Sequence, residues 1–237
     1  MPMLVRSACL TNFREVAATT GIDARAQLRL AGIDWRCLDD PDLKIPAASV
    51  CELLERSAAV AGIENFGLRM AQMRRLSNLG LIALLAREEA SVRAALQSLI
   101  RTLYLHNEGI VLVLEEANGI AVVHEDFIAL AGGSMRQAVE LSIGVTFRML
   151  REFLGPAWQP SSVCFTHHAP RDTRLHAGMF GTRVQFNSIL NGITCRSHEL
   201  DRAMPLADPE SARMVREYLI GSAGAARPSD VAQVQRL

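Results

Sequence analysis

The sequence predicts an α+β fold in which an N-terminal helical portion packs with an antiparallel sheet of about four strands, crossed by one long helix. Through residues 1–107 the apolar side chains recur at helical spacing. Beyond residue 107 the period changes, and runs rich in β-branched residues alternate with turn residues. One long amphipathic stretch, Ser134–Leu154, interrupts these runs. Helices first and strands later are typical of an α+β chain rather than of an alternating α/β chain.

Capping residues mark where the first helices begin and end. A short polar side chain accepts a hydrogen bond from the first turn, and glycine adopts the left-handed conformation that closes a helix. Proline is tolerated in a first turn, where its missing N–H would have no partner. These signals predict helices from Thr11 or Asn12 to Gly21, from Asp23 to Gly32, and from Pro46 to Gly62. Helical spacing continues through 64–78 and 79–107, and Ser91 is expected to cap a helix that divides the second stretch.

The strand-like region opens with a hairpin signal. Asn118 and Gly119 separate two apolar runs, and this dipeptide suits the positive φ angles of a tight two-residue turn. After the long helix, which is expected to end at Gly155, residues 161–168 predict another strand. A turn and two further strands, near 184–186 and around 193–197, are then expected.

The C-terminal stretch of the chain differs from the rest. Residues 207–230 predict a short helix followed by a linker, because 222–230 are small, contain proline and lack apolar periodicity. Residues 231–237 start a new helix with Ser229 or Asp230 as its cap, which suggests that a further domain follows. We therefore expect one domain over residues 1–206, with a helical portion over residues 1–107 and an α+β portion over residues 108–206.

Composition excludes several classes of function. Acidic and basic residues balance, giving a formal net charge of +0, whereas a chain that grips nucleic acid by itself needs a clustered basic excess. The cysteines are odd in number and form no CxxC pair, which favours reduced thiols over a disulfide framework. We find no signal peptide and no apolar run near the ~20 residues of a membrane span. These features predict a soluble cytoplasmic protein.

Three candidate ligand-binding residues flank the predicted hairpin: Tyr104, His106 and His124. His124 is in register with Ile120 and Val122, so it is expected on the same face of its strand as those apolar residues. A histidine on an apolar face is usually a satisfied core residue. The functional alternative is a polar group in the wall of a ligand pocket.

Arg148 and His167 complete the candidate set. Facing inward from the long helix, Arg148 would hold a ligand carboxylate bidentately; facing outward, it is a solvated arginine beside Arg151. His167, with His168 and Cys164, also suggests a zinc site. However, neighbouring residues of a strand point to opposite faces, so we predict no metal.

Motifs for catalysis are missing from the sequence. It contains no G-x-S-x-G, H-E-x-x-H, P-loop or G-x-G-x-x-G pattern. The carboxylate pairs Glu88-Glu89 and Glu115-Glu116 are adjacent residues, which normally lie on solvated faces rather than converging on one site. We predict no enzyme activity and no cofactor.

Several segments, in this order, resemble the N-terminal "arabinose-binding" family of AraC/XylS-type transcription regulators. They are Phe66–Gln72, Leu79–Leu85, 91–107, 163–172, 179–187 and 200–209, which together span about Ile45 to Pro209. The resemblance implies an effector-sensing and dimerisation domain, and it implies that residues 231–237 begin a C-terminal helix-turn-helix domain of about a hundred residues. It supplies no metal and does not fix the ligand, because ligands differ between members.

The function expected from this resemblance is ligand sensing. A small effector, such as an amino-acid-like compound or another carboxylate metabolite, would bind between the helical portion and the sheet. Its binding would favour one arrangement of a homodimer, and DNA would be contacted only through the C-terminal domain. A stand-alone α+β enzyme or small-molecule carrier and a dimerisation module without a ligand remain the alternatives.

Overall fold

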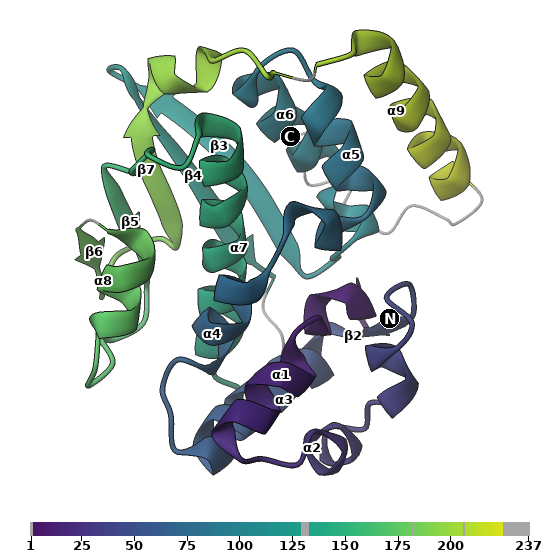
Figure 1. Ribbon diagram of the computed structural model, residues 1–237, viewed down its shortest axis with the longest axis vertical. Helices are drawn as coiled ribbons and strands as arrows, with labels where there is room; N and C mark the ends of the chain where they lie inside the picture. The colour runs from purple at the N-terminus through teal and green to yellow at the C-terminus, as the bar shows by residue number, and fades with distance from the viewer. Residues whose placement is uncertain (1, 129–132, 182, 206, 225–237) are drawn as a thin grey trace.

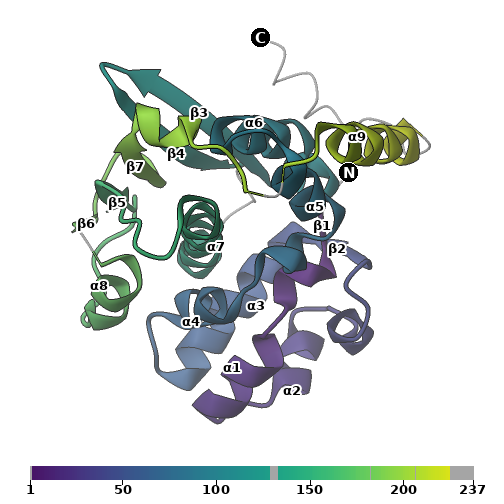
Figure 2. The same ribbon diagram turned by 45° about the horizontal axis from the view of Figure 1, so that its top comes forward.

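The computed structural model describes residues 2–128, 133–181, 183–205 and 207–224, and it confirms the predicted α+β class (Figure 1). Helices make up most of the N-terminal portion and cover one face of a sheet that is built from the later residues (Figure 2). Residues 225–237, where the rest of the predicted linker and the start of a further helix fall, lie outside the described residues.

The N-terminal helices begin and end close to the predicted residues. They are α1 (Phe13–Thr20), α2 (Ala24–Leu30), α3 (Ala47–Ala61), α4 (Phe66–Met73), α5 (Leu81–Glu88) and α6 (Val92–Thr102). Asp23 caps α2 by accepting a hydrogen bond from the N–H of Ala26 at 3.1 Å. Ser91 caps α6 in the same way, with the N–H of Ala94 at 3.2 Å, as its sequence position predicts.

A small ladder in the helical portion was not predicted from the sequence. Strand β1 (Leu4–Arg6) pairs antiparallel with β2 (Lys44–Pro46). Strands of three residues are too short to show the alternation by which strands are recognised. The pairing ties the N-terminus to the start of α3, and the 3₁₀ helix η1 (Ser7–Leu10) follows β1 directly.

The main sheet has five strands among the described residues, in the order β3-β4-β7-β5-β6. They are β3 (Ile110–Ala117), β4 (Ile120–Phe127), β5 (Ser162–Cys164), β6 (Val184–Gln185) and β7 (Gly192–Arg196). The predicted hairpin joins β3 to β4, with φ of 53° at Asn118 and 77° at Gly119.

One pairing at the edge departs from the predicted antiparallel sheet of about four strands: β5 and β6 run parallel. Between them the chain forms α8 (Arg174–Phe180), where the sequence predicted only a turn. A connecting helix carries the chain back across the sheet, so that the next strand enters in the same direction. The helix has seven residues and no side-chain N-cap, which explains why its sequence signal is weak.

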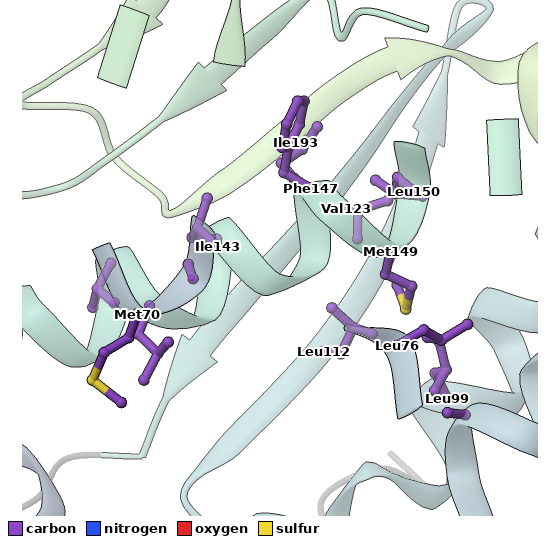
Figure 3. Close-up of a cluster of buried hydrophobic side chains, with 14 of the residues drawn as sticks. Met70, Leu76, Leu99, Leu112, Val123, Ile143, Phe147, Met149, Leu150 and Ile193 are labelled. Carbon is purple, nitrogen blue, oxygen red and sulfur yellow. The ribbon is translucent and has the colours of Figure 1, made fainter. Parts of the chain in front are cut away.

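The long helix α7 (Arg136–Leu154) crosses the sheet, as predicted, and lies between it and the helices α3 and α4 (Figure 2). Phe147 and Leu150 of α7 belong to the same core cluster as Val123 and Ile193 of the sheet (Figure 3). Apolar burial on both sides of α7 fixes the helix in the centre of the molecule.

Two glycines allow α4 and α7 to approach closely. A Cβ atom at Gly144 of α7 would lie 2.5 Å from the Cβ of Ala71, and one at Gly67 of α4 would overlap the carbonyl oxygen of Gln137. Because larger side chains cannot occupy these positions without moving a helix, the crossing is specified by the sequence.

The last described element is α9 (Pro209–Gly224), which packs on α5 (Figure 1). It continues past Gly221, into the first residues of the predicted linker. None of the described helices is both long and apolar enough to cross a membrane.

Candidate ligand-binding cavity

A cavity of about 130 Å³ lies where the helical portion meets the sheet. Its walls come from α3, α6, α7 and the hairpin strands, and from the 3₁₀ helices η3 (Leu76–Leu79) and η4 (Leu103–Leu105). Most of the lining is apolar, and it includes Val50, Leu54, Leu99, Leu112, Leu141 and Met149. Leu99, Leu112 and Met149 are drawn in Figure 3, where they converge from α6, β3 and α7.

Arg74 is a buried cation in the wall of this cavity. It follows α4, and only 5% of its surface is exposed. Its Nη1 donates to the carbonyl of Ala8 at 2.5 Å and its Nη2 donates to the carbonyl of Cys9, whereas its buried Nε–H has no acceptor. No carboxylate of the described residues lies within ion-pair distance of it. Burial lowers the pKa of Arg74 to about 10, so the guanidinium stays charged at neutral pH.

Glu125 supplies a carboxyl group to the same cavity from β4, and it is 3% exposed. Its Oε1 accepts a hydrogen bond from the hydroxyl of Thr146 at 2.6 Å, while its buried Oε2 has no partner. Burial raises the pKa of Glu125, against the smaller opposing effect of the Ser142 and Thr146 hydroxyls. Its environment therefore favours the neutral acid.

His106 follows η4 and is 8% exposed. Its Nδ1 lies 3.3 Å from Nη1 of Arg6. A guanidinium only donates, so Nδ1 accepts and the ring proton resides on Nε2. Burial, together with the positive charges of Arg6, Arg74 and Lys44, lowers the pKa of His106 to about 3. The imidazole is therefore neutral and sits beside a cluster of cations.

The five residues singled out in the sequence do not come together. His106 lines the cavity, whereas Tyr104 is half-buried in η4 outside its lining. His124 is buried in β4 in the predicted register with Ile120, on the face opposite Glu125, and its ring nitrogens lie 3.6 Å from carboxylate oxygens of Glu115 and Asp126. Whether Tyr104 or His124 meets a ligand stays a prediction.

Arg148 and His167 lie elsewhere, on α7 and after β5. Arg148 is exposed and donates from Nε to the backbone carbonyl of Arg74 at 2.7 Å, so it supports the loop that carries Arg74. Nε2 of His167 is 3.6 Å from Oε1 of the fully buried Glu140, which also lies 3.1 Å from Nε2 of His176. His168 is exposed. Among the residues that the structure describes, no group of three or more potential ligands is placed to hold a metal ion.

Arg74 and Glu125 were not among the residues selected from the sequence. Glu125 shares the inner face of β4 with Val123 and Phe127, which are two residues away on either side. A carboxylate on an otherwise apolar strand face was the sequence signal that could have identified it. Arg74 gives no comparable signal, because an arginine next to Arg75 at a helix end resembles a solvated basic pair.

Comparison with known proteins places this chain among transcription regulators. The chain belongs to the family described as the arabinose-binding domain of AraC transcription regulator, N-term, whose model matches residues 21–204. The family resemblance found in the sequence is thereby confirmed, and so is the class of regulatory domain.

Two curated relatives are regulators as well. The chain is 27% identical over 218 residues to the HTH-type transcriptional regulator VirS of Mycobacterium tuberculosis, covering 91% of this chain and 64% of that protein. It is 22% identical over 202 residues to the ornithine utilization regulator of Pseudomonas aeruginosa, covering 84% of this chain and 59% of the relative. The chain thus spans less than two thirds of the length of these relatives.

A solved structure supports the fold. The transcriptional regulator CdpR from Pseudomonas aeruginosa superposes with a TM-score of 0.56 at 14% identity, covering 90% of this chain and 72% of that chain. At this identity the likeness concerns the arrangement of helices and strands.

Proposed function

We propose that this chain is the effector-sensing domain of an AraC-type regulator and that its effector binds in the cavity between the helical portion and the sheet. In the whole regulator, the bound effector favours one arrangement of a homodimer. A C-terminal helix-turn-helix domain then reads paired half-sites on DNA. The domain acts in the cytoplasm and catalyses no reaction.

The observation that carries this proposal is a set of polar atoms buried without partners around one apolar cavity. The Nε–H of Arg74 and Oε2 of Glu125 both lack a hydrogen-bond partner, and both residues line the cavity. An unsatisfied buried polar group costs about 1–3 kcal/mol, and more when it is charged. A few convergent polar groups among apolar walls are typical of small-molecule sites.

A route for the signal runs from the cavity to the last described helix. Leu99 of α6 lines the cavity, and the neighbouring Ser98 donates a hydrogen bond to Oε1 of Glu89. The same carboxylate oxygen accepts from Arg216 of α9. A ligand that shifts α6 therefore acts on α9, the element that leads toward the C-terminus, through one shared carboxylate.

A ligand screen tests this function. A ligand at a hundred times its Kd is expected to stabilise the domain by about 2.7 kcal/mol, which a thermal shift detects. Ala47→Leu, which fills the cavity from the start of α3, should abolish the shift, whereas Ala59→Leu on the exposed side of α3 should leave it unchanged. Turnover of a bound compound, or binding that is insensitive to Ala47→Leu, would contradict the proposal.

The homodimer has its own test. Sedimentation equilibrium of the domain with and without a ligand from that screen should show a dimer whose dissociation constant changes with ligand. Equal dimer stability in both states would remove the proposed coupling, because a ligand shifts an equilibrium only through different affinities for its two states.

A further inference from the structure

Arg74 leaves one positive charge in the cavity without a counter-ion. Both of its anchoring partners, Ala8 and Cys9, offer neutral backbone carbonyls. Buried charges in proteins are ordinarily paired with an opposite charge. The free Nε–H and an adjacent Nη–H form one edge of the guanidinium. In proteins such an edge binds a carboxylate through two parallel hydrogen bonds.

The surroundings of Arg74 add to the positive potential. The positive charges of Arg6, Lys44 and Arg74 all lower the pKa of His106, so its ring stays neutral. Arg75, which is exposed, also lines the cavity and brings a further cation to its rim. Arg6 is paired with Asp42, and Oε2 of Glu108 accepts from the N–H of Leu4, so neither carboxylate is paired with Arg74. The part of the cavity beside Arg74 therefore attracts an anion.

Glu125, the buried carboxyl group in the cavity wall, does not favour a cation. It shares its Oε1 with the hydroxyl of Thr146, and its burial favours the uncharged acid. A neutral carboxylic acid binds a hydroxyl or carbonyl group, or simply borders an apolar ligand, and it attracts an ammonium group only weakly. Arg74 and Glu125 therefore differ in what they bind: Arg74 favours an anion, and Glu125 favours a neutral group.

The size of the cavity limits the ligand. An apolar protein cavity of about 150 Å³ holds one benzene molecule. The cavity of about 130 Å³ is of the same order, and Leu54, Leu99 and Met149 line its body. A ligand body about as large as one benzene ring or a short alkyl chain fits such a volume.

Building on the sensing function proposed above, we infer that the effector is a small monocarboxylate with an apolar body, held by its carboxylate on the Nε edge of Arg74. The neutral His106 also lines the cavity, close enough to Arg74 to feel its charge, and its Nε2–H is available as a donor. The apolar body lies among the leucines of α3 and α6.

Calorimetry with matched probes tests this class of ligand. Benzoate and hexanoate are titrated into the domain at pH 7, beside their neutral amides, benzamide and hexanamide, and the amine benzylamine. We expect at least one carboxylate to bind at least tenfold more tightly than its amide, because only the carboxylate neutralises Arg74. Phenylalanine and leucine, which carry an ammonium group as well, should bind more weakly than the monocarboxylates.

Variants locate the interaction. Arg74→Met should weaken carboxylate binding at least tenfold, and Arg74→Lys, which keeps the charge without the fork of donors, should weaken it by less. Arg151→Met is the matched control, because Arg151, like Arg74, donates to a backbone carbonyl, in its case from Nε to that of Pro156, but lies outside the cavity lining. Glu125→Gln should weaken carboxylate binding by less than Arg74→Met does, because it leaves the cation in place.

The outcomes separate this inference from the sensing function. Equal affinity for an acid and its amide would overturn the monocarboxylate class. So would binding of the amine or of an amino acid that Glu125→Gln abolishes. In both cases the cavity remains a sensor site. If none of these probes and no compound of the wider screen binds, both the proposed sensing function and the proposed ligand class are wrong. The comparison of acid and amide uses the unaltered chain, so it remains decisive even where an Arg74 variant fails to fold.

Discussion

Two regions of this molecule bury ionisable groups, and they do so differently. Glu140, which is fully buried in α7, has nitrogen partners close to its Oε1: Nε of Arg136 lies 3.4 Å away and Nε2 of His176 lies 3.1 Å away. Around the cavity, Arg74 and Glu125 are both buried, yet neither has an ionic partner among the described residues. Oε1 of Glu140 therefore has partners within the chain, although its Oε2 has none, whereas Arg74 has no carboxylate partner among the described residues; in our proposal the ligand supplies it.

The largest expected effect lies in the Glu140 cluster. Glu140→Ala removes the carboxylate that Arg136 and His176 share, while Arg136 keeps its contact with Glu64, so we expect a loss of about 3 kcal/mol, the lower end of the range for breaking a buried pair. Urea denaturation should show this loss in the free energy of unfolding. A loss below about 1 kcal/mol, the size of an exposed ion pair, would mean that the cluster is not the structural counterpart of the cavity.

The next effect concerns His106 and acid. Its pKa is lowered to about 3 from an ordinary 6.5, so the folded state resists its protonation. The stability it contributes is present above pH 6.5 and is lost as pH falls toward 3. His106→Asn should therefore remove part of the acid destabilisation, on the order of 2 kcal/mol by pH 4.5. Unfolding curves from pH 8 to 4 measure it, and unchanged pH dependence would contradict the neutral imidazole.

The stability contributed by Glu125 should change with pH in the opposite direction to that of His106. Burial raises its pKa, so its contribution to stability is present below its ordinary value of 4.5 and is lost as pH rises toward the raised value. Glu125→Gln keeps the shape and the acceptor for Thr146 but removes the ionisation. Stability at pH 7 should rise, on the order of 1 kcal/mol, with little change at pH 4. A clear loss of stability at pH 7 would indicate a paired, ionised carboxylate instead.

The smallest effect is expected outside the cavity. His124 faces away from Glu125, and its neighbours Glu115 and Asp126 are exposed. His124→Asn should change the free energy of unfolding by about 1 kcal/mol or less and leave ligand affinity unaltered. A tenfold loss of affinity in the calorimetric titration would move the ligand site to the other face of the sheet.

Local signals in the sequence were sufficient for most of the fold. Asn118-Gly119 specifies a hairpin through backbone sterics, and Ser91 specifies a helix start through one hydrogen bond. Elements whose formation depends on distant partners were missed: β1 exists because β2, about forty residues later, pairs with it. The parallel pairing of β6 depends in the same way on the path through α8.

The candidate site was predicted less well than the fold for the same reason. The general location between helices and sheet followed from the fold class, and His106 followed from its place beside the hairpin. Arg74 and Glu125 acquire their significance only from burial and from missing partners, which are properties of the packed structure. The sequence shows that an arginine is present, but it does not show whether the folded chain places a carboxylate within ion-pair distance of it.

The most direct test of the central claim follows the Nε–H of Arg74 itself. In a ¹H–¹⁵N spectrum of arginine side chains, adding the carboxylate that binds best should move the Arg74 resonance downfield and slow its exchange with water. The Arg151 resonance should stay in place, and the matching amide should leave both unchanged. If the carboxylate binds while the Arg74 resonance does not move, the guanidinium is not the group that recognises the effector.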